Sequence, residues 1–420
     1  MGAPLKRTRD RALMLREHLS ELRRLADTAG AVVVGELTQQ LDRPHPGTYL
    51  GVGKLDELKA LVAEHGVTLV IFDDELTPSQ AKNIEDIVGQ RVVDRAELIL
   101  DIFATRARTA ESKMQVELAQ LEYMLPRLTR MWTHLEKFRG GIGVRGPGET
   151  QLETDRRLIS HRIKLLKDRL KEVEKGRLVQ RSGRRDEFKA SLVGYTNAGK
   201  SSILRGLAQA DDVFVEDRLF ATLDPLTREV KLGDNSRALV TDTVGFIRKL
   251  PHHLVASFRA TLEEAKDADV LLHIVDASHP MWEEQRDVVS DVLRELGLTD
   301  HPVLMVFNKM DLVGDDSLAF QERVTAETPG AVFVSAETDG GLDPLRRALL
   351  AALRVNRPVV EIRFSHSNGK LLAEIHREGE VMDQRTIGEE LVVRARVNDR
   401  LAGRLRQAGA TVQRDVVRAT

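Results

Sequence analysis

An eight-residue pattern in the middle of the chain, G-x-x-x-x-G-K-S, has the residue types and spacing of a phosphate-binding loop. It follows the apolar stretch 190–193 and precedes a segment with helical patterning. In such a loop backbone N–H groups surround the phosphates, Lys200 contacts the β- and γ-phosphates, and the Ser201 hydroxyl binds Mg²⁺. Taken alone, the pattern also fits a glycine-capped turn. The residues of the loop and of the following turn are Gly194, Tyr195, Thr196, Asn197, Ala198, Gly199, Lys200, Ser201 and Ser202.

A second motif, D-T-V-G, follows the apolar stretch 238–241 and comprises Asp242, Thr243, Val244 and Gly245. The carboxylate of Asp242 is predicted to hold Mg²⁺ through water. The N–H of Gly245 is predicted to contact the γ-phosphate without a side chain in the way. The order of the two motifs along the chain is the order found in a GTPase domain.

Two further motifs predict that the base is guanine. Asn308, Lys309 and Asp311 follow the apolar stretch 303–307. The Asp311 carboxylate can accept hydrogen bonds from the N1–H and 2-amino groups of guanine, which adenine lacks, so a buried acceptor would be left unpaired with ATP. Ser335 and Ala336 follow the stretch 331–334, where their backbone N–H groups are predicted to bind the guanine O6. GTP is therefore favoured over ATP.

The segment that senses the γ-phosphate is expected between the first two motifs, in residues 214–228. It contains Phe220, Ala221 and Thr222, and we predict that the Thr222 hydroxyl completes the Mg²⁺ shell when GTP is bound. Thr227 is the alternative, and a threonine that only caps a turn also fits. Catalysis is assigned to Lys200, Thr222 and Gly245.

Two residues bear on how hydrolysis would proceed. Phe246 stands where Ras-type enzymes carry the glutamine that orients the attacking water, so intrinsic hydrolysis is expected to be slow. Asn197 occupies the place at which potassium-stimulated GTPases bind a monovalent cation, which suggests K⁺ as an additional cofactor. Asparagine is also an ordinary turn residue, so both interpretations stay open.

Composition limits the class of protein. A chain of 420 residues exceeds one compact core and predicts two to four domains. It has no cysteine, which excludes disulfides and cysteine zinc sites. No apolar segment is long enough to span a bilayer, and the N-terminus lacks the apolar region of a signal peptide, so we expect a soluble, cytoplasmic protein with no membrane partner.

The charge is unevenly distributed. Residues 127–189 contain 18 Lys and Arg against 9 Asp and Glu, although the formal net charge of the chain is −2. In this region apolar residues recur three and four positions apart over 118–135 and again over 152–173, with Pro126 expected to kink the first run. The segment 140–149 between them is rich in glycine. We predict an antiparallel helical hairpin with a glycine-rich tip.

The tip of this hairpin is the predicted RNA-binding site. Basic side chains and backbone without bulky side chains suit a narrow space lined by RNA, although a disordered connector or a solvated basic face is the alternative. The RNA-binding set is Arg139, Gly140, Gly141, Gly143, Arg145, Gly146, Gly148, Arg156 and Arg157.

The flanking regions carry no certain chemistry. Residues 31–106 read as a separate α/β unit, with strands at 31–34 and 67–72 and helices at 54–65, 79–88 and 96–107. Thr77, Pro78 and Gln80 have the types and spacing of a helix start with a capping box. The Gly51–Lys54 run more often starts a helix than binds a nucleotide. Residues 358–420 are predicted to form strands at 359–364 and 391–397, a turn at 367–369 and a closing helix.

Long runs outside the GTPase motifs resemble the HflX family of ribosome-associated GTPases across nearly the whole chain. These runs are D-D-E-L-T-P-S-Q at 73–80, Q-V-E-L-A-Q-L at 115–121, the stretch 140–157, and F-A-T-L-D-P at 220–225. The resemblance implies a GTPase that binds the large (50S) ribosomal subunit and its rRNA and directs the hairpin toward the peptidyl-transferase centre. In several bacteria such a protein separates stalled 70S ribosomes under stress. The resemblance also explains Phe246, since the family has a hydrophobic residue in place of the catalytic glutamine.

These observations together predict an α/β protein. It comprises an N-terminal α/β domain (1–110), a basic helical hairpin (111–183), a P-loop GTPase domain with a mostly parallel sheet (187–355) and a small C-terminal α+β domain (356–420). The predicted cofactors are GTP or GDP and Mg²⁺, and the protein is expected to be a monomer. A large-subunit assembly GTPase and a nucleotide-regulated RNA-binding adaptor are the alternative functions.

Overall fold

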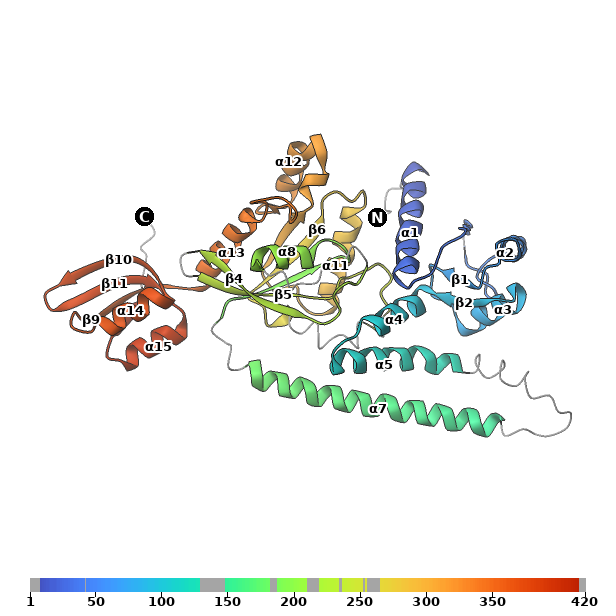
Figure 1. Cartoon of the computed structure of the whole chain (residues 1–420), viewed down its shortest axis with the longest axis horizontal. Helices are drawn as coiled ribbons and strands as arrows, with labels where there is room; N and C mark the ends of the chain where they lie inside the picture. Colours follow the sequence, from blue (N-terminus) through green and yellow to red (C-terminus); the bar gives the residue numbers. More distant parts are fainter. Residues whose placement is uncertain are drawn as a thin grey trace, which may run out of the picture. The chain divides into compact units, whose positions relative to one another are not determined.

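The computed structural model describes residues 8–41, 43–128, 148–181, 187–209, 219–233, 236–251, 254 and 265–414 (Figure 1). The chain folds into two compact units. Unit 1 comprises Met1–Arg177, Glu216–Asp224 and Ile247–Ala260, and unit 2 comprises Leu178–Val215, Pro225–Phe246 and Thr261–Thr420. Two short segments of the predicted GTPase domain therefore pack within unit 1.

Unit 1 is built around a small parallel sheet. Strands β1 (Leu69–Phe72) and β2 (Arg91–Asp94) pair in register, with Leu69 opposite Arg91. The surrounding helices are α1 (Thr8–Thr28), α2 (Val52–His65), α3 (Pro78–Val88) and α4 (Arg95–Arg106). Their inward side chains, such as Ile84 and Ile99, are fully buried. Burial of these apolar faces is the main stabilising contribution to the unit.

Two local predictions for unit 1 are confirmed. The Thr77 hydroxyl accepts a hydrogen bond from the Gln80 N–H at 3.2 Å, and the Gln80 side chain accepts one from the Thr77 N–H at 3.0 Å. This is the capping box expected from the sequence. Gly51 is the N-cap of α2, so the Gly51–Lys54 run starts a helix as predicted.

The strand predicted at 31–34 is wrong. These residues follow α1 without forming a strand, and Val32 and Val34 are 87% and 54% exposed. Among the described residues no strand pairs with this segment. A run of β-branched residues favours a strand only where a neighbouring strand supplies hydrogen bonds and a buried face.

The hairpin helices α5 (Ala110–Met124) and α7 (Gly148–Arg181) run in opposite directions (Figure 1). Arg162 on α7 donates two hydrogen bonds to the Glu117 carboxylate on α5, at 2.7 and 2.8 Å. At Pro126 the first arm tightens into a 3₁₀ turn, η1 (Leu125–Arg127), which confirms the predicted distortion. Residues 129–147, which include most of the predicted tip, lie outside the described residues.

The main sheet of unit 2 has six strands in the order β4-β5-β3-β6-β7-β8. Only β4 is antiparallel to its neighbour, so the predicted mostly parallel sheet is confirmed. Every residue of the central strand β6 is buried, as expected for a parallel strand covered on both faces. The strands are β3 (Lys189–Gly194), β4 (Leu226–Gly233), β5 (Ser236–Asp242), β6 (Val270–Asp276), β7 (Val303–Asn308) and β8 (Val332–Phe333).

Helices on the two faces of this sheet make separate cores. Residues of α8 (Lys200–Ala208) and α13 (Asp343–Asn356) pack with Leu192, Leu272 and Ile274. Residues of α11 (Trp282–Glu295) and α12 (Ser317–Glu327) pack with Val275 and Phe307. Short 3₁₀ turns η3 (Met310–Leu312) and η4 (Gly314–Asp316) follow β7. The sheet is thus fixed on both faces, and its strand ends carry the polar motifs.

The C-terminal part of unit 2 is a four-stranded antiparallel sheet in the order β10-β11-β9-β12. The expected strands and helix are present, whereas α14, β10 and β12, the strand that follows the helix, were not predicted. The elements are β9 (Val359–Ser365), α14 (Gly369–Glu378), β10 (Glu380–Ile387), β11 (Glu390–Arg396), α15 (Asp399–Gln407) and β12 (Thr411–Arg414).

Candidate nucleotide-binding site

The predicted phosphate loop joins the end of β3 to the start of α8. Gly199 caps the helix with a φ of 92°, a conformation that favours glycine. A Cβ at this position would lie 2.2 Å from the Asn308 amide nitrogen, so any other residue would displace that side chain. The N-terminus of α8 therefore presents backbone N–H groups to an anion.

Lys200 begins α8 and its side chain turns back over the loop. The ammonium donates hydrogen bonds to the carbonyls of Gly194 at 3.2 Å and Tyr195 at 2.9 Å, and the residue is only 6% exposed. Burial lowers the pKa of Lys200 to about 8, against the opposing effect of Asp242. A bound phosphate would stabilise the charged form of this side chain.

Ser201 and Asp242, the two residues predicted to hold Mg²⁺ from the loop and from β5, lie side by side. The Ser201 hydroxyl donates to the Asp242 carboxylate at 2.6 Å, and Asp242 is fully buried at the end of β5. The neighbouring Thr243 hydroxyl is bound to the Leu192 carbonyl at 2.6 Å and so faces away from the site. Hydroxyl and carboxylate oxygens are ligands that Mg²⁺ prefers, together with phosphates and water. No cluster of three His, Asp or Glu occurs among the described residues, and a Mg²⁺ site completed by phosphate oxygens does not require one.

Gly245 and Phe246 lie directly against the phosphate loop. The Thr196 N–H donates to the Phe246 carbonyl at 2.7 Å, and the Phe246 N–H donates to the Gly194 carbonyl at 3.0 Å. A Cβ on Gly245 would lie 2.7 Å from the Thr196 Cα, so only glycine fits. The Phe246 ring is 1% exposed and offers no polar group to orient water.

The predicted guanine motifs meet at the ends of β7 and β8. The Asn308 amide donates to the Ala198 carbonyl at 3.0 Å and accepts from the Ala336 N–H at 3.2 Å, so it links the phosphate loop to the last motif. The Ser335 hydroxyl donates to the Asp311 carboxylate. The carboxyl ends of parallel strands are where ligands bind in open α/β sheets.

Lys309 has a partner that the sequence analysis missed. Its ammonium lies 2.7 Å from the carboxylate of Asp276, which ends β6 and also accepts from the Ser278 hydroxyl at 2.6 Å. An acidic residue at the end of a continuous apolar strand was the available signal.

The two candidate threonines differ in their surroundings. Thr227 is in β4, and its hydroxyl lies 2.8 Å from that of Thr241 on β5, so it is engaged within the sheet. Thr222 follows Phe220 and Ala221 in the part of the chain that packs within unit 1. The Phe220 ring is buried against Phe103, with centroids 4.6 Å apart, so only its backbone could contact a nucleotide. The assignment of Thr222 to Mg²⁺ stays a prediction.

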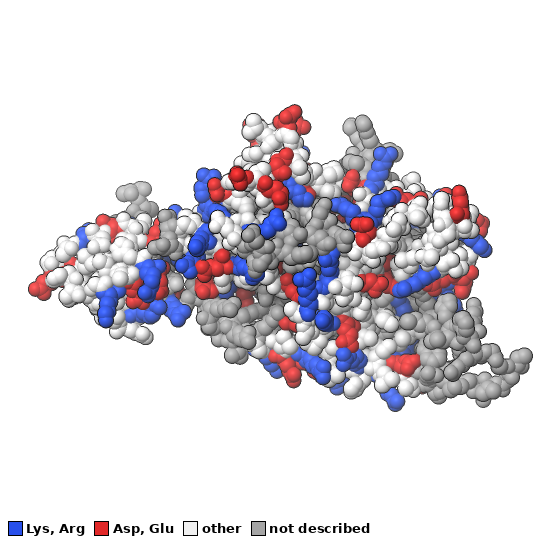
Figure 2. All heavy atoms as spheres, viewed as in Figure 1, with Lys and Arg blue, Asp and Glu red and all other residues white. Residues whose placement is uncertain are grey.

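The predicted RNA-binding residues are only partly described. Gly148 is the first residue of α7, and Arg156 and Arg157 are exposed on that helix. Lys and Arg are interspersed with Asp and Glu over the visible face of the molecule (Figure 2). The remaining predicted residues, Arg139, Gly140, Gly141, Gly143, Arg145 and Gly146, lie outside the described residues.

Within the described part of the chain, no helix is both long and apolar enough to cross a membrane. The sheet order, the phosphate loop and the polar strand ends define a P-loop GTPase. Family models match residues 16–309 almost continuously, in three parts. These are "GTP-binding GTPase N-terminal" at residues 16–104, "GTP-binding GTPase Middle Region" at 106–184 and "50S ribosome-binding GTPase" at 189–309.

Two curated relatives match most of this chain and most of their own length. A "GTPase HflX" of Caldanaerobacter subterraneus subsp. tengcongensis is 44% identical over 412 residues, covering 96% of this chain and 94% of that protein. The "GTPase HflX" of Escherichia coli is 43% identical over an alignment that covers 86% of this chain and 85% of that protein. The crystal structure of a GTP-binding protein from Sulfolobus solfataricus in complex with GDP is 26% identical in sequence. The match covers 80% of this chain and 95% of that one, with a TM-score of 0.44. The chain belongs to the HflX family of ribosome-associated GTPases, which bind guanine nucleotides and hydrolyse GTP.

Proposed function

We propose that this GTPase binds the large (50S) ribosomal subunit through its basic hairpin and dissociates stalled 70S ribosomes under stress, acting in the cytoplasm as a monomer. The observation that carries the proposal is the excess of basic residues in 127–189, a segment that contains 18 Lys and Arg but only 9 Asp and Glu. A polyanionic partner such as rRNA would be attracted by this excess.

The geometry of α7 supports this partner. The helix has 34 residues, which at about 1.5 Å per residue gives a length of roughly 50 Å. It begins at Gly148, directly after the glycine-rich segment, and Arg156 and Arg157 are exposed near that end. A long helix held to α5 by ion pairs can carry a glycine-rich tip into a narrow RNA-lined space.

Nucleotide chemistry would control this binding. Mg²⁺ would be held by Ser201, by Thr222 and, through water, by Asp242, and would neutralise charge on the phosphates. Lys200 and the loop N–H groups bind the phosphates, and the N–H of Gly245 contacts the γ-phosphate. GTP would order the segments that contain Thr222 and Gly245 and favour ribosome binding, and hydrolysis would release the protein. Since Phe246 cannot orient water, the ribosome is expected to order these segments for hydrolysis.

The proposal is tested by measuring GTP turnover with and without purified 50S subunits, alongside sedimentation of 70S ribosomes. Stimulated turnover with conversion of 70S to subunits is expected, also with a non-hydrolysable GTP analogue. Stimulation without conversion would favour the assembly alternative. If neither occurs, the RNA-binding adaptor is the better interpretation.

A pair of double variants would locate the ribosome contact. Replacing Arg156 and Arg157 with Gln removes two charges near the tip, and replacing Arg169 and Lys171 removes two exposed charges about 20 Å further along α7. We expect the first pair to weaken 50S binding and its salt dependence more than the second. Equal losses of 50S affinity in the two double variants would mean that the ribosome is attracted by the charge of the whole helix and does not contact the tip in particular.

K⁺ is a further proposed cofactor, through Asn197. This residue has a φ of 60°, a left-handed conformation that asparagine adopts readily, so turn formation alone would also account for it. Turnover should therefore be compared in K⁺ and Na⁺ buffers. An unchanged rate would remove K⁺ from the proposal.

A further inference from the structure

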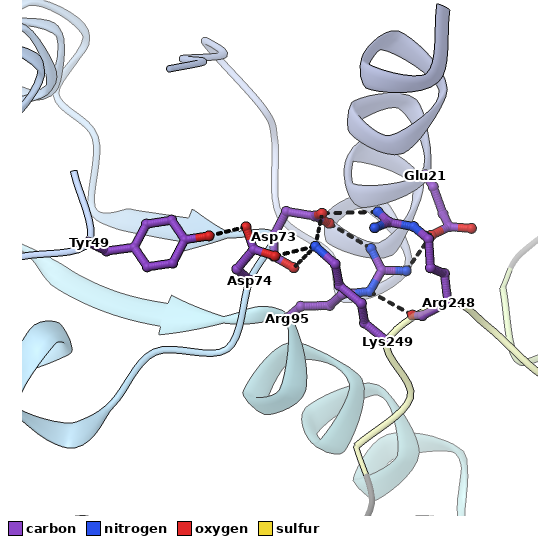
Figure 3. A network of polar contacts seen from close by, with 7 residues as sticks. All are labelled: Glu21, Tyr49, Asp73, Asp74, Arg95, Arg248 and Lys249. Carbon is purple, nitrogen blue, oxygen red and sulfur yellow. Dashed lines mark hydrogen bonds and ion pairs between the residues drawn. The ribbon is translucent and has the colours of Figure 1, made fainter. Parts of the chain in front are cut away.

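A cluster of charged side chains in unit 1 includes two residues that directly follow the γ-phosphate motif. Arg248 and Lys249 come two and three residues after Phe246, and both bind the Asp73 carboxylate at 2.9 Å. Lys249 also pairs with Asp74, which accepts from the Tyr49 hydroxyl. Figure 3 shows the side chains converging on the loop after β1.

A buried arginine fixes the other side of this cluster. Arg95, at the start of α4, is 1% exposed and pairs with Glu21 and, at 2.8 Å, with Asp73. It also donates to the Arg248 carbonyl at 3.1 Å, so it holds the backbone of the same segment (Figure 3). The three carboxylates of Glu21, Asp73 and Asp74 thus balance three cations. These contacts fix where Arg248 and Lys249 lie in unit 1.

The segment around Thr222 is held within unit 1 in a similar way. The Asp224 carboxylate accepts from the Thr109 hydroxyl at 2.6 Å and from the N–H groups of Arg108 and Thr109 at 3.1 and 3.3 Å. Thr109 is the N-cap of α5, so a negative charge lies at the N-terminus of the first hairpin helix. The segment that contains Thr222 and the segment that contains Arg248 and Lys249 are therefore each held in unit 1 by their own carboxylate contacts.

Backbone strain marks the same two segments. Lys249 has a φ of 54° and Phe220 a φ of 56°, a left-handed region that lysine and phenylalanine rarely adopt. Such conformations persist only where surrounding contacts hold them, and they gather at switch regions. The ion pairs of Lys249 and the buried ring of Phe220 are the contacts that do so here.

The phosphate loop shows what would release the charged cluster. In unit 2 the Thr196 N–H donates to the Phe246 carbonyl at 2.7 Å. In a phosphate loop the backbone N–H groups surround the α- and β-phosphates, which GDP and GTP share, whereas the predicted contact to the γ-phosphate is the N–H of Gly245. A γ-phosphate would draw Gly245 and the next residue, Phe246, toward the nucleotide, and the chain joins Phe246 to Arg248 through a single residue. Withdrawal of Phe246 would pull on the cluster.

We propose that the Asp73–Asp74 pair is a latch that holds Arg248 and Lys249 when no γ-phosphate is present and releases them when GTP binds. Asp73, Asp74 and Lys249 are then positioning residues for the γ-phosphate motif. Because coupling between two sites is reciprocal, the latch lowers the affinity for GTP relative to GDP. The inference requires guanine-nucleotide binding alone and is independent of the ribosome.

The test compares the affinity of the full chain for GDP with that for a non-hydrolysable GTP analogue. Lys249→Asn removes the ion pairs and places at 249 a residue that tolerates a positive φ. We expect the preference for the analogue over GDP to rise by about 5-fold or more, the lower end of typical coupling. Lys249→Arg keeps the charge and should retain the wild-type preference. The matched control is Arg23→Gln, which breaks an exposed ion pair with Glu36 elsewhere in unit 1.

An unchanged preference in Lys249→Asn would overturn the proposal, and so would an equal rise in Arg23→Gln. A second measurement keeps the test valid if Lys249→Asn does not fold. Amide hydrogen exchange of residues 72–77 in the wild-type chain should be faster with the analogue than with GDP. Identical exchange in the two states would also exclude the latch.

Discussion

The phosphate loop and the Asp73 latch are both polar sites, but they are assembled in different ways. The loop uses consecutive residues, and the Lys200 side chain donates to the backbone carbonyls of Gly194 and Tyr195 within the same loop. The latch joins side chains that are as far apart in the chain as Asp74 and Lys249, 175 positions. A local site can be identified from spacing, whereas a long-range site becomes visible only in the folded chain. The predictions below test how far the two sites depend on each other.

The largest effect is expected from Lys200→Ala in the phosphate loop. This change removes a buried cation that contacts the phosphates, and loss of one such group typically lowers turnover by about 10²–10³-fold. The N-terminal unit should be unaffected. GTP turnover and thermal unfolding of the full chain would be measured together, with Lys231→Ala, an exposed lysine on β4, as the control. Retained turnover in Lys200→Ala would refute the assigned role.

Arg95→Met is the corresponding change beside the latch, because Arg95 pairs with Asp73. It would remove the buried cation that pairs with both Glu21 and Asp73 and leave the remaining balance to Arg248 and Lys249. Removal of one partner from a buried ion pair typically costs about 3–5 kcal/mol, and we expect the lower end of this range. Amide exchange should show loss of protection in α4 and β2, while β6 in unit 2 keeps its protection. The control is Arg91→Gln, which breaks an exposed pair with Glu97 and should cost less than about 1 kcal/mol. Similar losses in both variants would argue against a special role for the buried arginine.

This contrast explains which predictions from the sequence were confirmed. The capping box at Thr77 and the helix start at Gly51 depend on neighbours in the chain, and both were predicted. The GTPase sheet pairs strands far apart in the chain, and it was predicted because local nucleotide-binding motifs mark the ends of its strands. The strand at 31–34 was wrong because a strand also needs a partner strand, which no local pattern reveals. The Lys309–Asp276 pair and the latch were missed for the same reason. In the D-D-E-L-T-P-S-Q run the capping residues have a local pattern, whereas the interactions of Asp73 and Asp74 follow only from their partners in the folded chain.

Asp311→Asn tests base recognition and is expected to have a smaller effect. The amide cannot accept both guanine hydrogen bonds, so GTP affinity should fall by about 100-fold, or roughly 2–3 kcal/mol, as for a hydrogen bond to a charged group. Xanthosine triphosphate should gain affinity, because its 2-carbonyl can accept from the new amide. Asp315→Asn, an exposed change in the next turn, serves as the control. If the preference for guanine persisted, the base would be bound elsewhere.

Asp73→Asn tests the latch through pH and should give the smallest effect. Burial alone would raise the pKa of Asp73, but Arg95, Arg248 and Lys249 lower it below its usual value. The carboxylate of Glu21 and that of Asp74, with its Tyr49 partner, also face this group. In the unfolded chain an aspartate has a pKa of about 3.9, so as the pH falls the unfolded state binds a proton before the folded state does.

The sign of the pH effect follows from this difference. The Asp73 charge stabilises unit 1 fully above the unfolded pKa, and this contribution is lost as the pH falls through the lower folded pKa. The slope reaches at most about 1.4 kcal/mol per pH unit for one proton. Asp73→Asn should be less stable than the wild type at neutral pH. The gap should begin to narrow at about pH 5, roughly one unit above the aspartate reference of about 3.9, and should go on narrowing as the pH falls through the lower folded pKa. Chemical unfolding of both chains across this range would show whether the gap closes, and a gap that stays constant would mean that Asp73 acts through packing and not through its charge.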